Sequence, residues 1–167
     1  NSKAGKNLSK NSFTAVVNGK DFTAKFAEGH ITEITNTLLL SGSMGNGEDI
    51  QLFLPQDTGA GTYSYDMGIQ GKYQKTDEDF SFANAGQLII ESHDTKNKYI
   101  KGSFNFTSKP MNSEAASYTI ENGSFSVHYW DRKYKNFKFC ETPFLKLLIW
   151  GAFFYTPALA KTSYSCS

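Results

Sequence analysis

Apolar and polar residues alternate with a period of two through most of the chain between Ser12 and Trp130. Successive side chains of a β-strand point to opposite faces of a sheet, so this period predicts strands with one apolar and one polar face. No window of this region combines helical spacing of apolar residues with capping residues. The pattern therefore predicts an all-β domain, an antiparallel β-sandwich or flattened barrel built from consecutive hairpins.

Turn residues separate the alternating runs and predict where the hairpins lie. An Asn-Gly pair favours a two-residue hairpin turn because both of its residues tolerate positive φ angles. Turn chemistry occurs at Asn18-Gly19, Gly45–Gly47, Asp94–Asn97 and Asn122-Gly123. We expect a hairpin at each of these four segments, with the run Phe22–Phe26 returning from the first of them as one strand.

The phase of the alternation also predicts part of the core. Phe104, Phe106, Phe125 and Val127 occupy the apolar phase of two runs that we expect to lie close together. These four side chains are therefore expected to share one buried face. Truncation of a phenylalanine on that face should then be strongly destabilising.

Charge and composition divide the chain at about Trp130. Residues 1–130 carry 11 lysines and 14 acidic residues, whereas residues 131–167 carry 6 basic and 2 acidic residues. We predict a flexible tether over residues 1–11, a β-domain over residues 12–130 that folds by itself, and a C-terminal extension over residues 131–167. The whole chain has a formal net charge of +1, so we expect no nucleic-acid partner, which would require a concentrated basic face.

The C-terminal extension contains an atypical apolar tail and both cysteines, Cys140 and Cys166. Its uninterrupted apolar run, Leu147–Tyr155, is shorter than the roughly 20 residues that a membrane-spanning helix needs. Whether the two cysteines pair depends on the distance between them, which the sequence does not give. Two origins of the extension stay open: translation in a shifted frame, or a native helix or hairpin that covers a sheet edge.

Several segments resemble one family. They are Phe13–Lys20, Leu40–Pro55, Gly86–Phe106 and Ile120–Val127, and each is similar to a strand or turn of an uncharacterised domain of unknown function found in lipoproteins of Bacteroidota. The resemblance covers about residues 12–130. It implies export and an extracytoplasmic position at the cell envelope, with membrane attachment only through an N-terminal lipid anchor that this chain does not include. It implies no activity and assigns no functional residues.

Catalytic and metal-binding patterns are weak in this sequence. Ser92-His93-Asp94 contains the three residue types of a hydrolytic triad, but neighbours on a strand point to opposite faces, so we interpret it as a strand end with a turn that Asp94 caps. His30, His93 and His128 lie far apart in the sequence, without metal-ligand spacing. We therefore expect no catalytic residues, no bound metal and no enzymatic activity.

Two loops resemble ligand sites only in their composition. Asp77–Asp79 contains three carboxylates but lacks the alternate spacing and the glycine of a calcium-binding loop. Gly42, Gly45 and Gly47 precede a predicted strand, whereas a phosphate-binding loop precedes a helix. We interpret these segments as a solvated loop and a hairpin turn, and we expect no cofactor.

Aromatic residues offer the remaining candidate site. The chain has 14 phenylalanines and 9 tyrosines, and most of them fall on the apolar phase of the predicted strands. Tyr63, Tyr65, Tyr73 and Tyr99 fit that core pattern least clearly. Because exposed aromatic rings stack on sugars and bases, these four tyrosines are the candidate ligand-binding residues.

The sequence thus predicts a non-catalytic, exported envelope or surface domain that binds a glycan, a small molecule or an envelope protein. One alternative is a purely structural module without a ligand pocket, and another is a hydrolase with an unrecognised site. A pocket lined by the tyrosines would favour the binding module, and a filled core would favour the structural module. Convergence of the histidines with carboxylates would favour the hydrolase.

Overall fold

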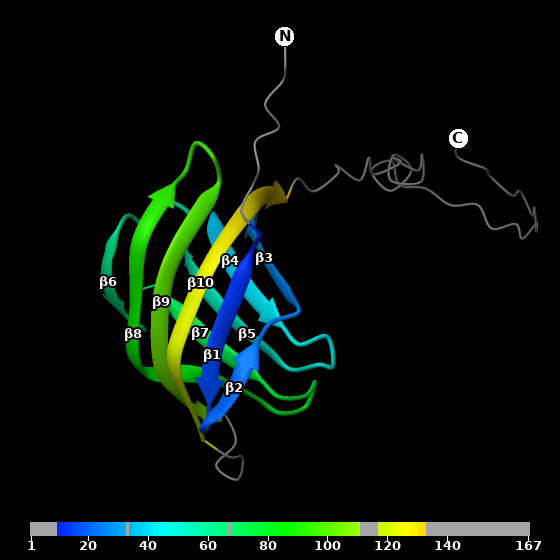
Figure 1. The fold of residues 1–167 in the computed structure, drawn as a ribbon. Coiled ribbons are helices and arrows are strands. Elements are labelled where there is room, and N and C mark those ends of the chain that lie inside the picture. Colours follow the sequence, from blue (N-terminus) through cyan, green and yellow to red (C-terminus); the bar gives the residue numbers. More distant parts are fainter. Residues whose placement is uncertain (1–9, 33, 67, 111–116, 133–167) are drawn as a thin grey trace, which may run out of the picture. The chain divides into compact units, whose positions relative to one another are not determined.

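The computed structural model describes residues 10–32, 34–66, 68–110 and 117–132, and every element in this part of the chain is a strand (Figure 1). The strands are β1 (Ser12–Val17), β2 (Lys20–Thr23), β3 (Phe26–Thr32), β4 (Thr37–Ser43), β5 (Asp49–Pro55), β6 (Gly61–Ser64), β7 (Gln70–Gln74), β8 (Phe80–Asp94), β9 (Tyr99–Pro110) and β10 (Tyr118–Arg132). The predicted all-β fold is confirmed.

Two long strands, β8 and β10, close the sheet, because each pairs with two different strands along one edge. Residues 120–126 of β10 pair with β1, and residues 129–132 pair in parallel with β3. Residues 80–82 of β8 pair with β7, and residues 87–90 pair with β6. Strand β9 pairs with the other edge of both, so β10, β3, β4, β5, β7, β8 and β9 form a closed ring. The result is a flattened barrel in which the β3–β10 pair is parallel and the other described pairs are antiparallel (Figure 1).

The interior of the barrel is filled by the side chains at the apolar positions of the alternating strands. The predicted buried face is confirmed, since Phe104, Phe106, Phe125 and Val127 are each at most 2% exposed. The ring of Phe13 lies 5.1 Å from that of Phe104 between ring centroids. The opposite strands make room for these rings with small residues: a Cβ on Gly42 would approach the Phe13 ring to 2.4 Å.

Three of the four predicted hairpin turns are confirmed. Asn18 and Gly19 both have positive φ, 48° and 77°, between β1 and β2. Strands β4 and β5 pair in register on either side of Gly45–Gly47. The Oδ1 atom of Asp94 accepts a hydrogen bond of 2.9 Å from the Asn97 amide, as expected for a turn that an aspartate caps.

The fourth predicted turn, Asn122-Gly123, is wrong. Both residues lie inside β10, where Glu121 and Asn122 together face a single residue of β9. Asn122 has a φ of 51°, so the positive φ that Asn-Gly provides serves a β-bulge within a strand. The sequence signal was a real preference for positive φ, and a bulge satisfies that preference as well as a hairpin does.

The predicted single strand Phe22–Phe26 is also wrong. The amide of Ala24 donates to the Phe13 carbonyl of β1, whereas the amide of Lys25 donates to the Ser43 carbonyl of β4. The chain therefore crosses from one strand neighbour to another at this point, and β2 ends at Thr23. Phe26 begins β3 and is 64% exposed, so it does not share the buried phase of Phe22.

The ends of the described domain differ slightly from the predicted limits. The Asn11 side chain bonds the Ala27 carbonyl and both the amide and the carbonyl of His128, so it belongs with the sheet rather than with a tether. Strand β10 continues past Trp130 to Arg132. The chain divides into two compact units, Asn1–Tyr134 and Lys135–Ser167, and only the first contains described residues.

Most of the predicted tether and extension, including Cys140, Cys166 and the apolar run Leu147–Tyr155, lies outside the described residues. Within the described ranges, no helix has the length and apolar character needed to cross a bilayer. Independent folding of the β-domain stays a prediction.

Candidate functional site

The four candidate tyrosines occupy separate parts of the barrel. Tyr63 and Tyr65, in and just after β6, are half-buried, and their hydroxyls donate to backbone carbonyls. The Tyr99 hydroxyl lies 2.8 Å from the Ser126 hydroxyl. Tyr73 is only 2% exposed and belongs to the core. The rings of Tyr65, Tyr73 and Tyr99 contact Phe106, Tyr118 and His128 rather than one another, so the four do not form one platform.

Tyr73 nevertheless lies at a pocket, which it shares with Tyr118. The pocket has a volume of about 260 Å³ at the end of the barrel where the β1–β2 and β4–β5 turns meet β7 and the start of β10. Its lining residues are Val17, Asn18, Lys20, Asp21, Phe22, Glu48, Tyr73, Lys75 and Tyr118. We call it the end pocket.

Two phenol–carboxylate hydrogen bonds organise the end pocket. The Tyr73 hydroxyl donates to Oε1 of Glu48 at 2.9 Å, and the Tyr118 hydroxyl donates to Oδ2 of Asp79 at 2.5 Å. The two rings meet edge to face, with centroids 4.6 Å apart. Since charge-assisted hydrogen bonds are stronger than neutral ones, these contacts hold the Glu48 and Asp79 side chains, and with them the turns after β4 and β7, against the pocket wall.

Both phenols remain protonated at neutral pH. Burial, with the hydrogen bond to Asp79 as the next cause, raises the pKa of Tyr118 to about 12. Burial also raises the pKa of Tyr73, with the Glu48 bond as the next cause. Each phenol therefore acts as a hydrogen-bond donor, and neither is an activated base or nucleophile.

These shifts predict a loss of stability at alkaline pH. An unfolded tyrosine ionises near its ordinary pKa of 10.0, whereas folded Tyr118 keeps its proton until about pH 12. The folded state thus binds more protons in this interval, so the stabilisation is complete below pH 10 and falls as the pH rises through 12. Urea unfolding at about pH 9 and about pH 11 should show the decline, and Tyr118→Phe should make it shallower. An equal decline in the wild type and in Tyr118→Phe would contradict the assignment.

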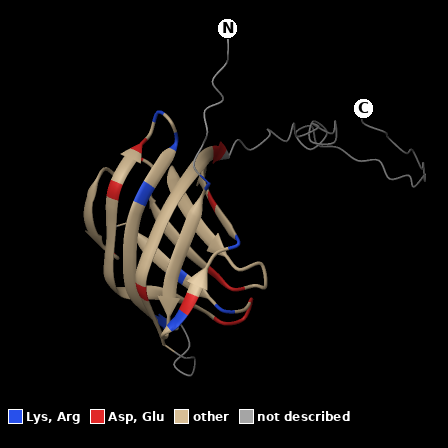
Figure 2. Ribbon diagram, in the orientation of Figure 1, with Lys and Arg blue, Asp and Glu red and all other residues tan. Residues whose placement is uncertain are grey.

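The rim of the end pocket carries both signs of charge. Lys20 and Asp21 come from the start of β2, and Lys75 follows β7. Charged residues gather around the turns at this end of the barrel, whereas the outer face of β8, β9 and β10 carries few (Figure 2). A carboxylate and an ammonium at one rim favour a polar ligand that itself carries complementary groups.

The predicted interpretation of Ser92-His93-Asp94 agrees with the geometry. The Nδ1 atom of His93 lies 2.7 Å from the Thr58 carbonyl oxygen, and because a carbonyl only accepts, Nδ1 carries the proton and donates. Nε2 lies 2.7 Å from the Tyr129 hydroxyl. Both ring nitrogens are therefore used to hold the loop after β5 against β10.

The other histidines also have local contacts. The backbone amide of His128 donates to Asn11, and the ring of His30 lies 6.0 Å from that of Trp130. Across the described residues, no three His, Cys, Asp or Glu side chains come together as a metal site would require.

The sequence named Tyr73 as a candidate but did not indicate its partners in the end pocket. Tyr118 lies 45 positions further along the chain and is not among the four candidate tyrosines; it is buried in the core. Glu48 lies beside a predicted turn, and Asp79 ends the run Asp77–Asp79, for which the sequence predicts a solvated loop. Only the strand order, which brings β7 and the start of β10 to one end of the barrel, shows that these residues meet.

One comparison with known proteins gave a match. A family model described as a domain of unknown function (DUF6252) matches residues 9–127. Neither the curated proteins nor the solved structures contain a match to the chain. The matched range covers nearly all of the described barrel, in agreement with the predicted uncharacterised family over about residues 12–130.

Proposed function

The chain belongs to the DUF6252 family, a domain of unknown function, and from the surface of this domain we propose that it is a non-catalytic binding module. In this proposal the module is exported to the cell envelope or surface. Its ligand is a small polar molecule held in the end pocket. The end pocket is the single observation that carries the proposal.

The size and lining of the end pocket define the class of ligand. Pockets for drug-sized ligands have volumes of about 300–1,000 Å³, so a volume of about 260 Å³ favours something smaller, of the size of an amino acid or one sugar ring. Lys20 and Lys75 offer ammonium donors, and Asp21 and Glu48 offer carboxylate acceptors. A zwitterion such as a free amino acid complements both, while the rings of Tyr73 and Tyr118 supply apolar contact.

Several contacts support a binding role over catalysis. Both nitrogens of His93 are engaged in hydrogen bonds that hold the fold. Glu48 and Asp79 accept hydrogen bonds from phenols that stay protonated, so no nucleophile in the pocket is paired with a base. The mixed charge of the rim also supports a small-molecule ligand over a nucleic acid, whose phosphates would select a basic face.

Export is proposed from the resemblance of the strand and turn motifs to lipoprotein domains of Bacteroidota. Membrane attachment would then require a lipid anchor N-terminal to this chain. Fractionation of host cells with an antibody against the β-domain tests this proposal directly. Recovery in the envelope or external fraction is expected, and recovery with the cytosolic proteins would overturn it.

The ligand is tested by nuclear magnetic resonance titration of the isotope-labelled chain with individual amino acids and monosaccharides. We expect amide shifts at Asn18, Glu48 and Lys75 with at least one zwitterionic probe. Glu48→Gln and Lys75→Ala should each weaken that binding by about tenfold, since charged hydrogen bonds contribute about 1.5–3 kcal/mol.

Lys101→Ala is the matched control for that experiment. Lys101 is an exposed lysine of β9 that pairs with Glu91 at 2.6 Å, away from the end pocket, so its removal should leave binding unchanged. If no probe shifts amides around the end pocket, the binding function assigned to it is wrong.

The competing function, a structural module without a ligand pocket, is favoured by one observation. The barrel interior is filled by side chains such as Leu38, Leu40, Ile50 and Leu52, all with 0% exposure, so a ligand has access only to the ends and the outer surface. A structural module predicts that no small molecule raises the melting temperature of the chain.

A further inference from the structure

The outer face of β8, β9 and β10 is hollowed between two β-bulges. In β8 the bulge lies at Asn84. Ala83 and Ala85 on either side of it pair with residues of β9, whereas Asn84 does not. In β10 it lies at Glu121 and Asn122, which together face Asn105. A bulge bends its strand and interrupts the ladder of backbone hydrogen bonds. Because the two bulges flank the same three residues of β9, Asn105 to Thr107, they bend the sheet on both sides of one place.

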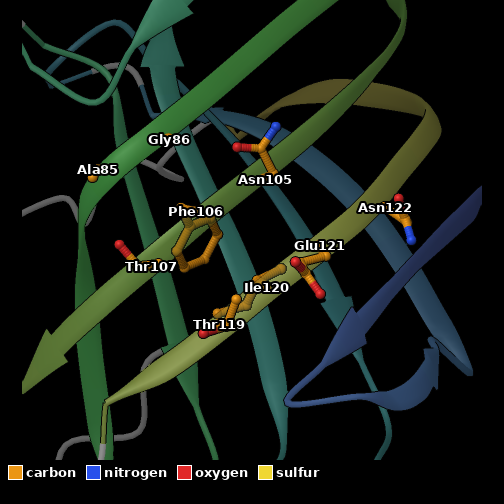
Figure 3. A pocket seen from close by; sticks show the side chains of 9 residues that line it. All are labelled: Ala85, Gly86, Asn105, Phe106, Thr107, Thr119, Ile120, Glu121 and Asn122. Carbon is orange, nitrogen blue, oxygen red and sulfur yellow. The ribbon is translucent and has the colours of Figure 1, made fainter.

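A depression of about 370 Å³ lies at that place. Its lining residues are Ala85, Gly86, Asn105, Phe106, Thr107, Thr119, Ile120, Glu121 and Asn122 (Figure 3). The side chains of Phe106 and Ile120 are buried in the core, whereas the polar side chains of the lining are exposed. We call it the face depression. It lies on different residues from the end pocket.

The polar groups of the face depression have unused hydrogen-bonding capacity. Thr107 donates to Asn84 at 3.1 Å. Within the described part of the chain, the side chains of Asn105, Glu121 and Asn122 make no hydrogen bond. Two amides, each with donors and an acceptor, and one carboxylate acceptor are thus presented together on a rigid sheet.

The chemistry of this set selects a neutral polyhydroxylated ligand. A sugar hydroxyl both donates and accepts, so it can form a hydrogen bond with either the NH₂ group or the carbonyl oxygen of a side-chain amide. The lining contains no Lys or Arg, and Glu121 repels anions, so a phosphate or an acidic sugar is disfavoured. A single exposed carboxylate attracts a cation only weakly, so a cationic ligand is also disfavoured. We propose that the face depression is a binding site for a neutral glycan, with Asn105 and Asn122 as the main hydrogen-bonding residues.

Isothermal titration calorimetry of the chain with neutral oligosaccharides tests the site. The probes are gluco-, manno- and galacto-oligosaccharides in α and β linkage, with a uronate-containing oligosaccharide as the acidic comparison. We expect at least one neutral probe to bind and the acidic probe to bind more weakly. Preference for the acidic probe, or no binding of any neutral probe, would overturn the proposal.

Variants locate the binding. Asn105→Ala removes one amide, and Asn122→Gly removes the other while keeping a residue that accepts a φ of 51°. Each should weaken binding of the neutral probe by about three- to tenfold. Glu121→Gln should leave the affinity for the neutral probe unchanged and should reduce the difference in affinity between the neutral and the acidic probe. Full affinity in the Asn105→Ala, Asn122→Gly double variant would contradict the assignment.

Two control variants distinguish the face depression from the rest of the barrel surface. Ser103→Ala changes a residue on the same face of β9, outside the depression, and should leave glycan affinity unchanged. Glu48→Gln alters the end pocket alone, so glycan binding should survive it. If Glu48→Gln abolishes glycan binding while Asn105→Ala does not, the glycan occupies the end pocket and the face depression is not a site.

Discussion

Replacing Phe104 with alanine is expected to lower the free energy of unfolding by about 3–5 kcal/mol. Phe104 is 2% exposed and its ring lies within 6.3 Å of the rings of Phe13, Phe106 and Phe125, measured between centroids. The loss combines the transfer free energy of the ring with the cost of a cavity that rigid strands cannot fill. Because domains are stable by only about 5–15 kcal/mol, this one change should remove a large part of the total.

Urea or thermal unfolding measures this effect, with Phe26→Ala as the matched control. Phe26 is 64% exposed, so the same substitution there should cost less than about 1 kcal/mol. A loss below about 1 kcal/mol for Phe104→Ala would mean that the ring does not pack as the structure shows. Equal losses at both positions would contradict the assignment of inside and outside faces in β9 and β3.

The strand pattern could be predicted because alternation depends on local geometry alone. Phe125, Val127 and Tyr129 are buried and the residues between them are not, as the period of two requires. Local turn chemistry likewise located the hairpin at Asn18-Gly19. The same signal failed at Asn122-Gly123, because positive φ is needed in both a hairpin and a bulge, and only the partner strands distinguish them.

The length of β8 shows a second limit of the pattern. Leu88 and Ile90 alternate with polar or exposed positions as a strand requires, but the strand begins further back, at Phe80. The bulge at Asn84 and the glycine at position 86 interrupt the alternation between these two parts, so the earlier part did not register as strand. Because a bulge interrupts the alternation, the sequence pattern predicted neither the full length of β8 nor the depression between the two bulges.

The candidate sites depended on strand order, which local patterns do not contain. The end pocket joins the turns after β1 and β4 to Tyr73 of β7 and Tyr118 of β10. The face depression joins β8, β9 and β10. Aromatic content made Tyr73 a candidate because it fitted the core pattern poorly, but Tyr73 is a core residue, 2% exposed, that also lines the end pocket. The aromatic content could not show that the partner of Tyr73 is Tyr118, or that Tyr63, Tyr65 and Tyr99 lie elsewhere.

Gly86→Ala is expected to destabilise the domain by at least about 3 kcal/mol, through two separate causes. Gly86 has a φ of 131°, which residues with a side chain rarely adopt. An added Cβ would also lie 2.2 Å from the Asn105 carbonyl oxygen and 2.6 Å from the Phe106 Cα, both of them backbone atoms of the paired strand. Backbone in the middle of a sheet cannot move aside as a flexible side chain can, so β8 and β9 must separate locally.

Two other glycines separate these causes. Gly47 has a φ of 95° with nothing within 4 Å of an added Cβ, so Gly47→Ala should show only the conformational cost, about 1–2 kcal/mol. Gly59 has open space and no positive φ, so Gly59→Ala should change stability by less than about 1 kcal/mol. Chemical unfolding should therefore rank the three losses as Gly86, then Gly47, then Gly59. A loss at Gly86 no greater than that at Gly47 would show that β8 and β9 are not in close contact there, and the two bulges would then not define the depression between them.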